Sequence, residues 1–266
     1  MLRIVADLGN SRLKWARLDA EGRLTPSTAL PPDDPLAWDA LWDDWHQDQR
    51  QPSRWAIASV NPPVAQRLAA FLQGRQVRQA AWYQTAADVP LAMDVDGAET
   101  GGADRALAVL AALAHMPAGR PGLVVSCGTA ITIERVTAGG VWQGGVIAPG
   151  LFLSARALHL LTAQLPLVHP DRSAPSWGRG TLPSLEAGVF WGTVGAVREL
   201  LARQSFEHDE KPWIVWTGGD AERLARAVCG EHARIIPDLV LNGLVRAALR
   251  TGAPFGASEC PPTKAG

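Results

Sequence analysis

Residues 122–136 read GLVVSCGTAITIERV: an apolar strand, a small polar turn and a second strand of alternating character. Gly128 and Thr129 form the turn, where backbone N–H groups and a hydroxyl can point at phosphate oxygens. The stretch therefore predicts a phosphate-binding hairpin. The alternative is an ordinary turn between two strands with a buried Cys127.

Residues 2–19, LRIVADLGNSRLKWARLD, repeat the order of strand, turn and strand. When residues 9–11 are placed on residues 128–130, Asp7 falls opposite Ser126. One short match is weak evidence of a repeat by itself, but it favours a duplicated lobe. Two such lobes are expected to face each other across a ligand-binding cleft.

The N-terminal hairpin carries more charge than its second copy. Gly9 allows the backbone to approach a ligand closely, and the amides of Asn10 and Ser11 can face phosphate oxygens. Lys14 adds a positive charge, and Asp7 can hold Mg²⁺ directly or through water. Ordinary hairpin turn chemistry explains the same residues about equally well.

The pattern of strands and helices predicts an α/β protein of two lobes. We expect an N-terminal lobe over 1–118, a C-terminal lobe over 119–250 and a loose tail over 251–266. An Ala- and Leu-rich segment at 102–116 predicts a helix. The helical spacing of Trp38, Trp42 and Trp45 (grouped in one short segment) predicts a packed helix face.

Composition excludes several classes of function. The chain has 266 residues, 47% of them apolar and 19% charged, and its net charge of −1 leaves no basic footprint for nucleic acid. Cys127, Cys229 and Cys260 are scattered without metal-ligand spacing, which fits a reducing compartment. Asp7 interrupts the first apolar run, and no stretch approaches the ~20 apolar residues of a membrane span. A cytoplasmic protein without membrane contact is expected.

Two further motifs carry candidate chemistry. GGADR opens the helix at 102–116, and Asp104 there is either an N-cap or a general base for a substrate hydroxyl. Arg105 beside it can bind a carboxylate or phosphate. VWTGGD places Gly218 and Gly219 after a strand, where a base or ribose can lie against the backbone; alone, a Gly-Gly pair more often marks a loop.

The order of these motifs is more specific than any one of them. Asp-x-Gly-Asn-Ser-x-x-Lys, Gly-Ala-Asp-Arg, Gly-Thr-Ala-x-Thr, GGVIAPG and TGG follow one another from residue 7 to about residue 249. This order resembles the type III pantothenate kinases, a family that includes the Bvg accessory factors. The resemblance implies the actin-like, hexokinase-like ATPase fold, with two duplicated α/β domains around a nucleotide cleft.

The resemblance also implies an activity. Members of the family are homodimers that phosphorylate pantothenate with ATP, giving 4'-phosphopantothenate in the first step of coenzyme A biosynthesis. They use a divalent cation such as Mg²⁺ and a monovalent one, K⁺ or NH₄⁺. The expected partners of this chain are therefore ATP, pantothenate and a second copy of itself.

Site residues follow from the motifs by position. The resemblance implies that Asp104 is the proton acceptor and that Asp7 binds the divalent cation. Ser126 lies at the position expected for the monovalent cation. The ATP-binding residues would be Asp7, Leu8, Gly9, Asn10, Ser11, Lys14, Gly128, Thr129, Gly218 and Gly219. The pantothenate-binding residues would be Gly102, Ala103, Arg105, His159 and Thr181, the last contributed by the partner subunit. Without the family, His159 would be a locally satisfied helix residue and Thr181 a cap or turn residue.

This chain departs from the family at two positions. The family has an aspartate, a ligand of the monovalent cation, where this chain has Ser126, so potassium binding is expected to be weaker, altered or absent. Glu134 on the following strand is a conceivable carboxylate donor but is expected to face solvent. The family also has a pantothenate-facing tyrosine shortly before the catalytic aspartate, whereas Tyr83, the one tyrosine here, lies too early.

Two other functions stay open at this point. The first is a regulatory or accessory protein that keeps the fold and has weak or no kinase activity. The two departures favour it, and the intact Asp104 disfavours it. The second is a kinase for another small hydroxyl compound, which the fold alone does not exclude.

Overall fold

A computed structural model describes residues 2–47, 52–169, 174–204 and 211–251 of the chain. The chain divides into two compact units. Unit 1 comprises Met1–His115 together with Asp238–Gly266, and unit 2 comprises Met116–Pro237. Cys260 and the expected tail beyond residue 251 lie outside the described residues.

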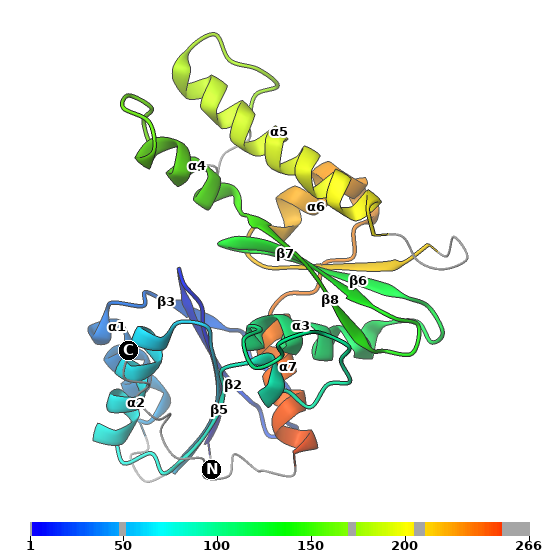
Figure 1. The fold of residues 1–266 in the computed structure, drawn as a ribbon. Helices are drawn as coiled ribbons and strands as arrows, with labels where there is room; N and C mark the ends of the chain where they lie inside the picture. The colour runs from blue at the N-terminus through cyan, green and yellow to red at the C-terminus, as the bar shows by residue number, and fades with distance from the viewer. Residues whose placement is uncertain (1, 48–51, 170–173, 205–210, 252–266) are drawn as a thin grey trace. The chain divides into compact units, whose positions relative to one another are not determined.

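Unit 1 is built on a five-stranded sheet in the order β3-β2-β1-β4-β5 (Figure 1). Its strands are β1 (Leu2–Leu8), β2 (Leu13–Arg17), β3 (Thr28–Leu30), β4 (Ser53–Ser59) and β5 (Gln79–Tyr83). β1 pairs with β2 antiparallel and with β4 parallel. β1 and β4 are central and read as near-continuous apolar runs, as expected for strands covered on both faces.

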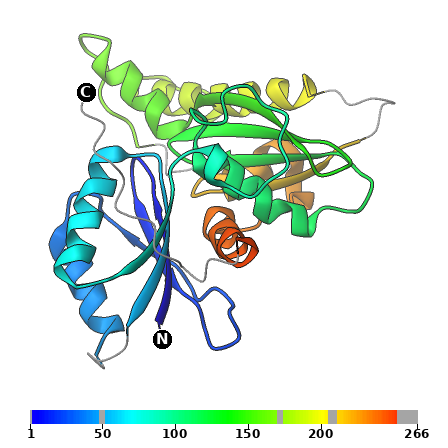
Figure 2. The same cartoon turned by 60° about the horizontal axis from the view of Figure 1, so that its bottom comes forward.

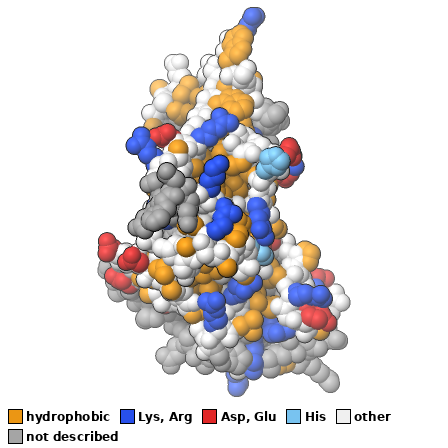
Figure 3. Space-filling model, turned by 90° about the vertical axis from the view of Figure 1, so that its right-hand side faces the viewer, with side chains coloured by type: hydrophobic (Ala, Val, Ile, Leu, Met, Phe, Trp, Pro, Cys, Tyr) orange, Lys and Arg blue, Asp and Glu red, His pale blue; other side chains and the backbone are white. Residues whose placement is uncertain are grey.

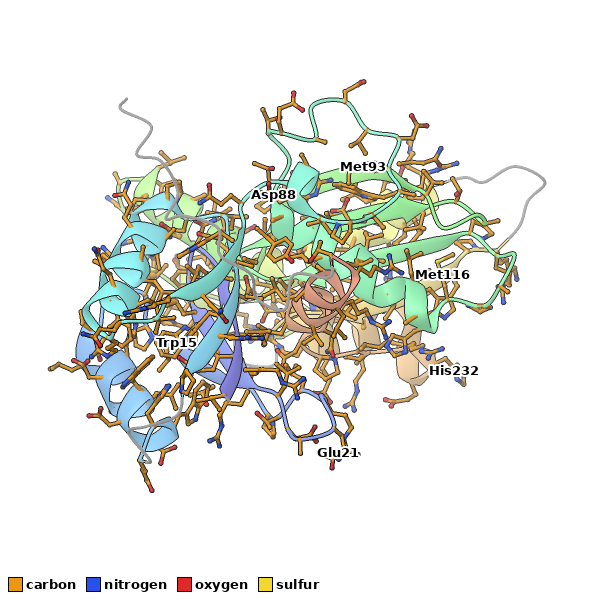
Figure 4. All side chains as sticks on the ribbon, turned by 90° about the horizontal axis from the view of Figure 1, so that it is seen from below. Trp15, Glu21, Asp88, Met93, Met116 and His232 are labelled. Atoms are coloured by element: carbon orange, nitrogen blue, oxygen red, sulfur yellow. The ribbon has the colours of Figure 1, made fainter. Side chains whose placement is uncertain are left out.

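Two helices, α1 (Pro35–Trp45) and α2 (Pro62–Gly74), cover one face of this sheet (Figure 1). Trp15 of β2 lies between the sheet and these helices, fully buried in a cluster with Trp38 and Trp55 (Figure 4). Asp34 and Asn61 start the two helices by accepting backbone N–H groups at their N-termini. The tryptophan spacing therefore marks a packed helix face, as predicted.

The opposite face of the sheet is covered by α7 (Leu239–Arg250), which also packs along α3 (Ala103–Ala112); Figure 2 shows α7 end-on beside the sheet. The two helices approach closely because residue 243 is glycine. A Cβ atom at Gly243 would overlap the backbone carbonyl of Leu107. This close approach fixes the helix that starts at Asp238 against the helix that carries Asp104.

Unit 2 has a four-stranded sheet in the order β8-β7-β6-β9. Its strands are β6 (Gly122–Cys127), β7 (Ala130–Val136), β8 (Trp142–Pro149) and β9 (Trp213–Thr217), and its helices are α4 (Leu151–Leu160), α5 (Thr181–Ala202) and α6 (Ala221–Cys229). Apolar residues of all three helices share one core cluster with β6, β7 and β9. Short 3₁₀ turns complete the two units: η1 (Ala86–Asp88), η2 (Leu113–His115) and η4 (Gly230–His232).

The two sheets have the same topology at their centres. In unit 2, β6 pairs with β7 antiparallel and with β9 parallel, as β1 does with β2 and β4. Asp7 and Ser126 each occupy the penultimate position of their strand. An isolated parallel bridge between Trp216 and Ile235 lies where unit 1 has β5. The repeat suspected from two short turns thus extends through both sheets.

The division of the chain differs from the boundaries expected from sequence. The sequence pattern assigned 119–250 to the second lobe, whereas Asp238 and α7 group with unit 1. The physical reason lies in the apolar face of α7. Leu241, Leu244 and Ala247 are fully buried, and α7 contacts α3, β1 and β4 of unit 1. The order of elements along the sequence did not show that the chain comes back to unit 1 at Asp238.

Candidate functional site

The N-terminal hairpin has a four-residue turn between the paired ends Leu8 and Leu13. The Gly9 N–H donates to the Arg12 carbonyl at 3.1 Å, which closes the turn. Leu8 is fully buried, whereas Asn10 and Ser11 are exposed. The predicted loop therefore presents its polar residues to solvent and anchors itself in the core through Leu8.

Asp7 lies at the centre of a charged group within unit 1. It faces Lys14 across the β1–β2 ladder. The pKa of Asp7 is raised to about 7, mainly by burial and also by the carboxylates of Asp104 and Asp238, while Lys14 lowers it. One ammonium group thus stands among three carboxylates, and such a group attracts an additional cation.

Asp238 is a member of this group that the sequence analysis missed. Its Oδ1 lies 2.8 Å from the Lys14 Nζ, and its Oδ2 accepts the Ser27 hydroxyl at 2.8 Å. In the sequence, Asp before an apolar helix is typical of an N-cap, and it does occupy that position in α7. Its side chain makes no cap hydrogen bond, so the carboxylate is used elsewhere.

Asp104 stands at the second position of α3, and the N-cap is Gly102. Asp104 is therefore not the N-cap that the sequence left open. Its Oδ1 accepts the backbone N–H of Arg105 at 2.9 Å. A Cβ at Gly102 would lie 2.5 Å from the same Oδ1, so the missing side chain at 102 makes room for the carboxylate. Ala103 is buried and Arg105 is half-buried beside it.

In unit 2, three glycine-bearing turns meet at one end of the sheet. The Gly150 N–H donates to the Thr129 carbonyl at 3.0 Å, and a Cβ at Gly150 would overlap the Gly128 carbonyl. Gly218 has a φ of +102°, and a Cβ there would overlap the backbone of Cys127. The structure therefore brings Gly128, Thr129, Gly218 and the adjoining Gly219 together, and it gives the GGVIAPG motif a packing role.

Ser126 lies in a row of hydroxyl side chains. It pairs with Thr132 of β7 and with Thr217 of β9. The Thr132 Oγ1 is buried and has no hydrogen-bond partner. Glu134 is fully buried and accepts the Trp142 Nε1–H at 3.0 Å, so the expectation that it faces solvent is wrong. The row offers uncharged oxygens at the position where the sequence resemblance implies a carboxylate.

His159 and Thr181 also lie in unit 2, and both are exposed. The Nδ1 of His159, near the end of α4, is 2.8 Å from the Leu165 carbonyl, which is a local contact. Thr181 is the first residue of α5 and lines an open hollow of about 450 Å³ with Arg179, Ser184 and Leu165. His159 contacts one of the residues that line this hollow.

The predicted site residues thus fall into two sets. Asp7 to Lys14 and Gly102 to Arg105 belong to unit 1, and Ser126 to Thr129, His159, Thr181 and Gly218–Gly219 belong to unit 2. Among the described residues, no group of three or more His, Cys, Asp or Glu side chains could cage a metal ion. None of the described helices combines the length and apolarity needed to cross a membrane.

Comparison with known proteins identifies relatives of the chain. A family model for type III pantothenate kinase matches residues 3–203. The type III pantothenate kinase of Gluconobacter oxydans is 34% identical over 96% of this chain and 96% of its own length. That of Synechococcus elongatus is also 34% identical, over 93% of this chain and 97% of its own length. That of Acidiphilium cryptum is 40% identical, over 63% of this chain and 62% of its own length.

Solved structures share the fold. A Baf family transcriptional activator from Campylobacter jejuni has a TM-score of 0.57 at 19% identity and covers 94% of this chain and 98% of its own. A 2-dehydro-3-deoxygalactonokinase protein from Sinorhizobium meliloti has a TM-score of 0.53 at 15% identity, covering 95% and 99%. These likenesses concern the fold alone, and they confirm the predicted actin-like, hexokinase-like class.

The raised pKa of Asp7 makes a prediction about stability. A carboxyl whose pKa rises on folding from 3.8 to about 7 binds its proton more tightly in the folded state, so stability is lost as pH rises between these values. Asp7→Asn removes this loss. Its gain in unfolding free energy over the parent should be about 2 kcal/mol larger at pH 8 than at pH 5.

Urea unfolding in metal-free buffer at the two pH values measures this difference. Asp94→Asn, at an exposed loop position, is the control for the loss of one carboxylate. A gain from Asp7→Asn that is equal at both pH values would contradict the raised pKa.

Proposed function

The chain belongs to the type III pantothenate kinase family, and from that premise we propose that it transfers the γ-phosphate of ATP to pantothenate. The family is one of kinases, so the chain is an enzyme that works on ATP with a divalent cation. The product would be 4'-phosphopantothenate, in the first step of coenzyme A biosynthesis. The observation that carries the proposal is the Asp104 carboxylate, which the start of α3 holds close enough to Asp7 to raise its pKa.

Each phosphate hairpin has a defined part in this proposal. Residues 7–14 would bind phosphate oxygens through the backbone amides and polar side chains of Asn10 and Ser11 and through the Lys14 ammonium. Gly128 and Thr129 would do the same in unit 2, and Gly218–Gly219 would lie against the base or ribose. Phosphoryl transfer depends mainly on positioning and on charge stabilisation, which backbone amides and a lysine supply.

Asp104 would accept the proton of the substrate hydroxyl. As the hydroxyl oxygen bonds to the γ-phosphorus, the bond from that phosphorus to the bridging oxygen of ADP breaks, and the hydroxyl proton passes to the Asp104 carboxylate. The backbone N–H of Arg105, at the start of α3, donates to the Asp104 Oδ1 at 2.9 Å and would stabilise its negative charge. A weak base suffices because the transition state is mostly dissociative.

The residues of unit 1 fit a divalent cation. Asp7 has a carboxylate whose charge is poorly compensated, as its raised pKa indicates. Mg²⁺ usually keeps several waters and binds through one or two carboxylates and the substrate phosphates, so no full protein cage is required. We propose Asp7 as its ligand. The cation would neutralise charge on the β- and γ-phosphates.

For pantothenate we propose Gly102, Ala103 and Arg105 on α3, with the Arg105 guanidinium paired to the substrate carboxylate. His159 and Thr181 would complete the acceptor site. No tyrosine precedes Asp104 in the segment where the family has one, and Tyr83 is buried at the end of β5. A kinase for a related hydroxyl compound is therefore the alternative substrate hypothesis.

A homodimer is also proposed. Apolar side chains are exposed on α4, on α5 and in the segment between them, among them Phe152, Leu153, Leu161, Trp177 and Trp191. Figure 3 shows hydrophobic side chains at the surface of this end of unit 2. Large apolar side chains exposed near one another are typical of protein interfaces. A sedimentation mass equal to one chain would reject the dimer, and with it the assignment of Thr181 to the partner's site.

The runner-up function is an accessory or regulatory protein with weak or no kinase activity. The transcriptional activator similar in fold is only 19% identical, so its described role does not transfer. A cytoplasmic location and the absence of nucleic-acid and membrane partners stay predictions from composition and charge. Phosphorylation of pantothenate by the purified chain separates these functions.

The first measurement is therefore ATP-dependent phosphorylation of pantothenate with Mg²⁺. We expect turnover by the parent and a loss of at least ~10³-fold in Asp104→Asn, with ATP affinity changed less than about threefold, because the amide cannot accept the proton. Asp96→Asn, at an exposed loop position, is the control. ATP binding without turnover by the parent would favour the accessory function, and near-normal turnover by Asp104→Asn would remove Asp104 as the base.

The monovalent cation is tested at Ser126. The hydroxyl row of Thr132, Ser126 and Thr217 supplies oxygens without charge, so we propose weak or no potassium activation in the parent. Ser126→Asp should increase the activation of turnover by K⁺, by about tenfold, because a carboxylate adds a favourable charge. Ser126→Asn is the matched uncharged control. A potassium titration unchanged by Ser126→Asp would show that the cation does not bind there.

A further inference from the structure

Lys14 has two carboxylates within reach in unit 1. It faces Asp7 directly across the β1–β2 ladder, and the Cβ atoms of such cross-strand pairs are about 4.5–5.5 Å apart. Its Nζ nevertheless bonds to Asp238 Oδ1 at 2.8 Å. The partner comes from a residue 224 positions later in the chain. The Lys14 side chain is 32% exposed and the Asp238 side chain 19%, so solvent screens this pair less than it screens a surface ion pair.

Asp238 is held in place on several sides. Its Oδ2 accepts the Ser27 hydroxyl, and its backbone carbonyl accepts the N–H of Asn242 at 2.9 Å and the Asn242 Nδ2–H at 3.0 Å. The residue has a left-handed backbone, with φ of 52° and ψ of 37°, at the start of α7. Gly243, early in the same helix, fixes α7 against α3. The carboxylate that receives Lys14 is therefore immobilised before any ligand binds.

We propose that Asp238 is a positioning residue, which holds the Lys14 ammonium away from Asp7 and so leaves the Asp7 carboxylate to the divalent cation. This inference rests on the proposed kinase function. An ammonium bonded to Asp7 would occupy a carboxylate oxygen and place a positive charge where the cation binds. Bonded to Asp238 instead, the ammonium keeps two N–H groups for phosphate oxygens.

Asp238→Asn tests the inference with little change in shape. Asparagine also tolerates the left-handed backbone, but it carries no charge to hold Lys14. Calorimetry with a non-hydrolysable ATP analogue gives the dissociation constant in EDTA and in Mg²⁺, and the ratio of the two measures how much the cation strengthens binding. We expect Asp238→Asn to lower this ratio about tenfold, because Lys14 turns to Asp7.

Lys14→Met supplies the control background. If Asp238 acts through Lys14, adding Asp238→Asn to Lys14→Met should change the ratio by less than about twofold, since the coupled partner is already gone. Ser27→Ala removes one hydrogen bond from the same carboxylate without changing charge. It should lower the ratio about two- to threefold in the parent and leave it unchanged in Lys14→Met. This pair keeps the test available if Asp238→Asn does not fold.

Two results would overturn the inference. One is a ratio that Asp238→Asn, or Ser27→Ala in its place, leaves unchanged. The other is an equal fall with and without Lys14, which would mean that the Asp238 charge acts on the cation directly and not through Lys14. Binding of the analogue needs no phosphate acceptor. A parent that binds it with Mg²⁺ but phosphorylates nothing would therefore end the proposed function and leave this inference standing.

Discussion

Repulsion among like charges is the constraint around which unit 1 is organised. Burial raises the pKa of Asp7, the nearby carboxylates of Asp104 and Asp238 raise it as well, and Lys14 lowers it. Such a group persists only where the surrounding packing fixes it. The buried apolar residues of the central strands, the tryptophan cluster behind β2 and the contact of Gly243 with Leu107 provide that packing. The scaffold therefore holds an excess of negative charge in place, and a bound cation would reduce it.

The second hairpin has the same topology as the first but carries different side chains. Asp7 of β1 pairs with Lys14 of β2, whereas Ser126 of β6 pairs with Thr132 of β7. Charge is replaced by hydroxyl groups, and close backbone contacts at Gly150 and Gly218 replace side-chain pairing. Unit 1 thus concentrates charge, while unit 2 offers backbone and neutral oxygen.

The sequence predicted those features that depend on residues close together in the chain. The two hairpins follow from glycine and polar residues between apolar strands, and the motif order led to the family and the fold. Three other features depend on the tertiary structure and could not be predicted from the sequence. Asp238 resembles an ordinary N-cap until the return of α7 brings it to Lys14. Glu134 alternates like a solvent-facing residue, but its face of the sheet is covered. The contact of Gly243 with Leu107 depends on how two distant helices cross, which periodicity does not encode.

Unit 1 is assembled from two stretches of chain, and the whole of unit 2 separates them. During synthesis the hairpin that carries Lys14 emerges from the ribosome well before Asp238 and α7, since Asp238 follows Lys14 by 224 residues. In the interval, α3 lacks the helix that packs along it, and Lys14 lacks its partner. Unit 2, which is continuous, can fold as soon as its last strand and helix have emerged. The charge cluster of unit 1 is thus completed last, so a nascent or truncated chain carries the sequence motifs without this assembled cluster.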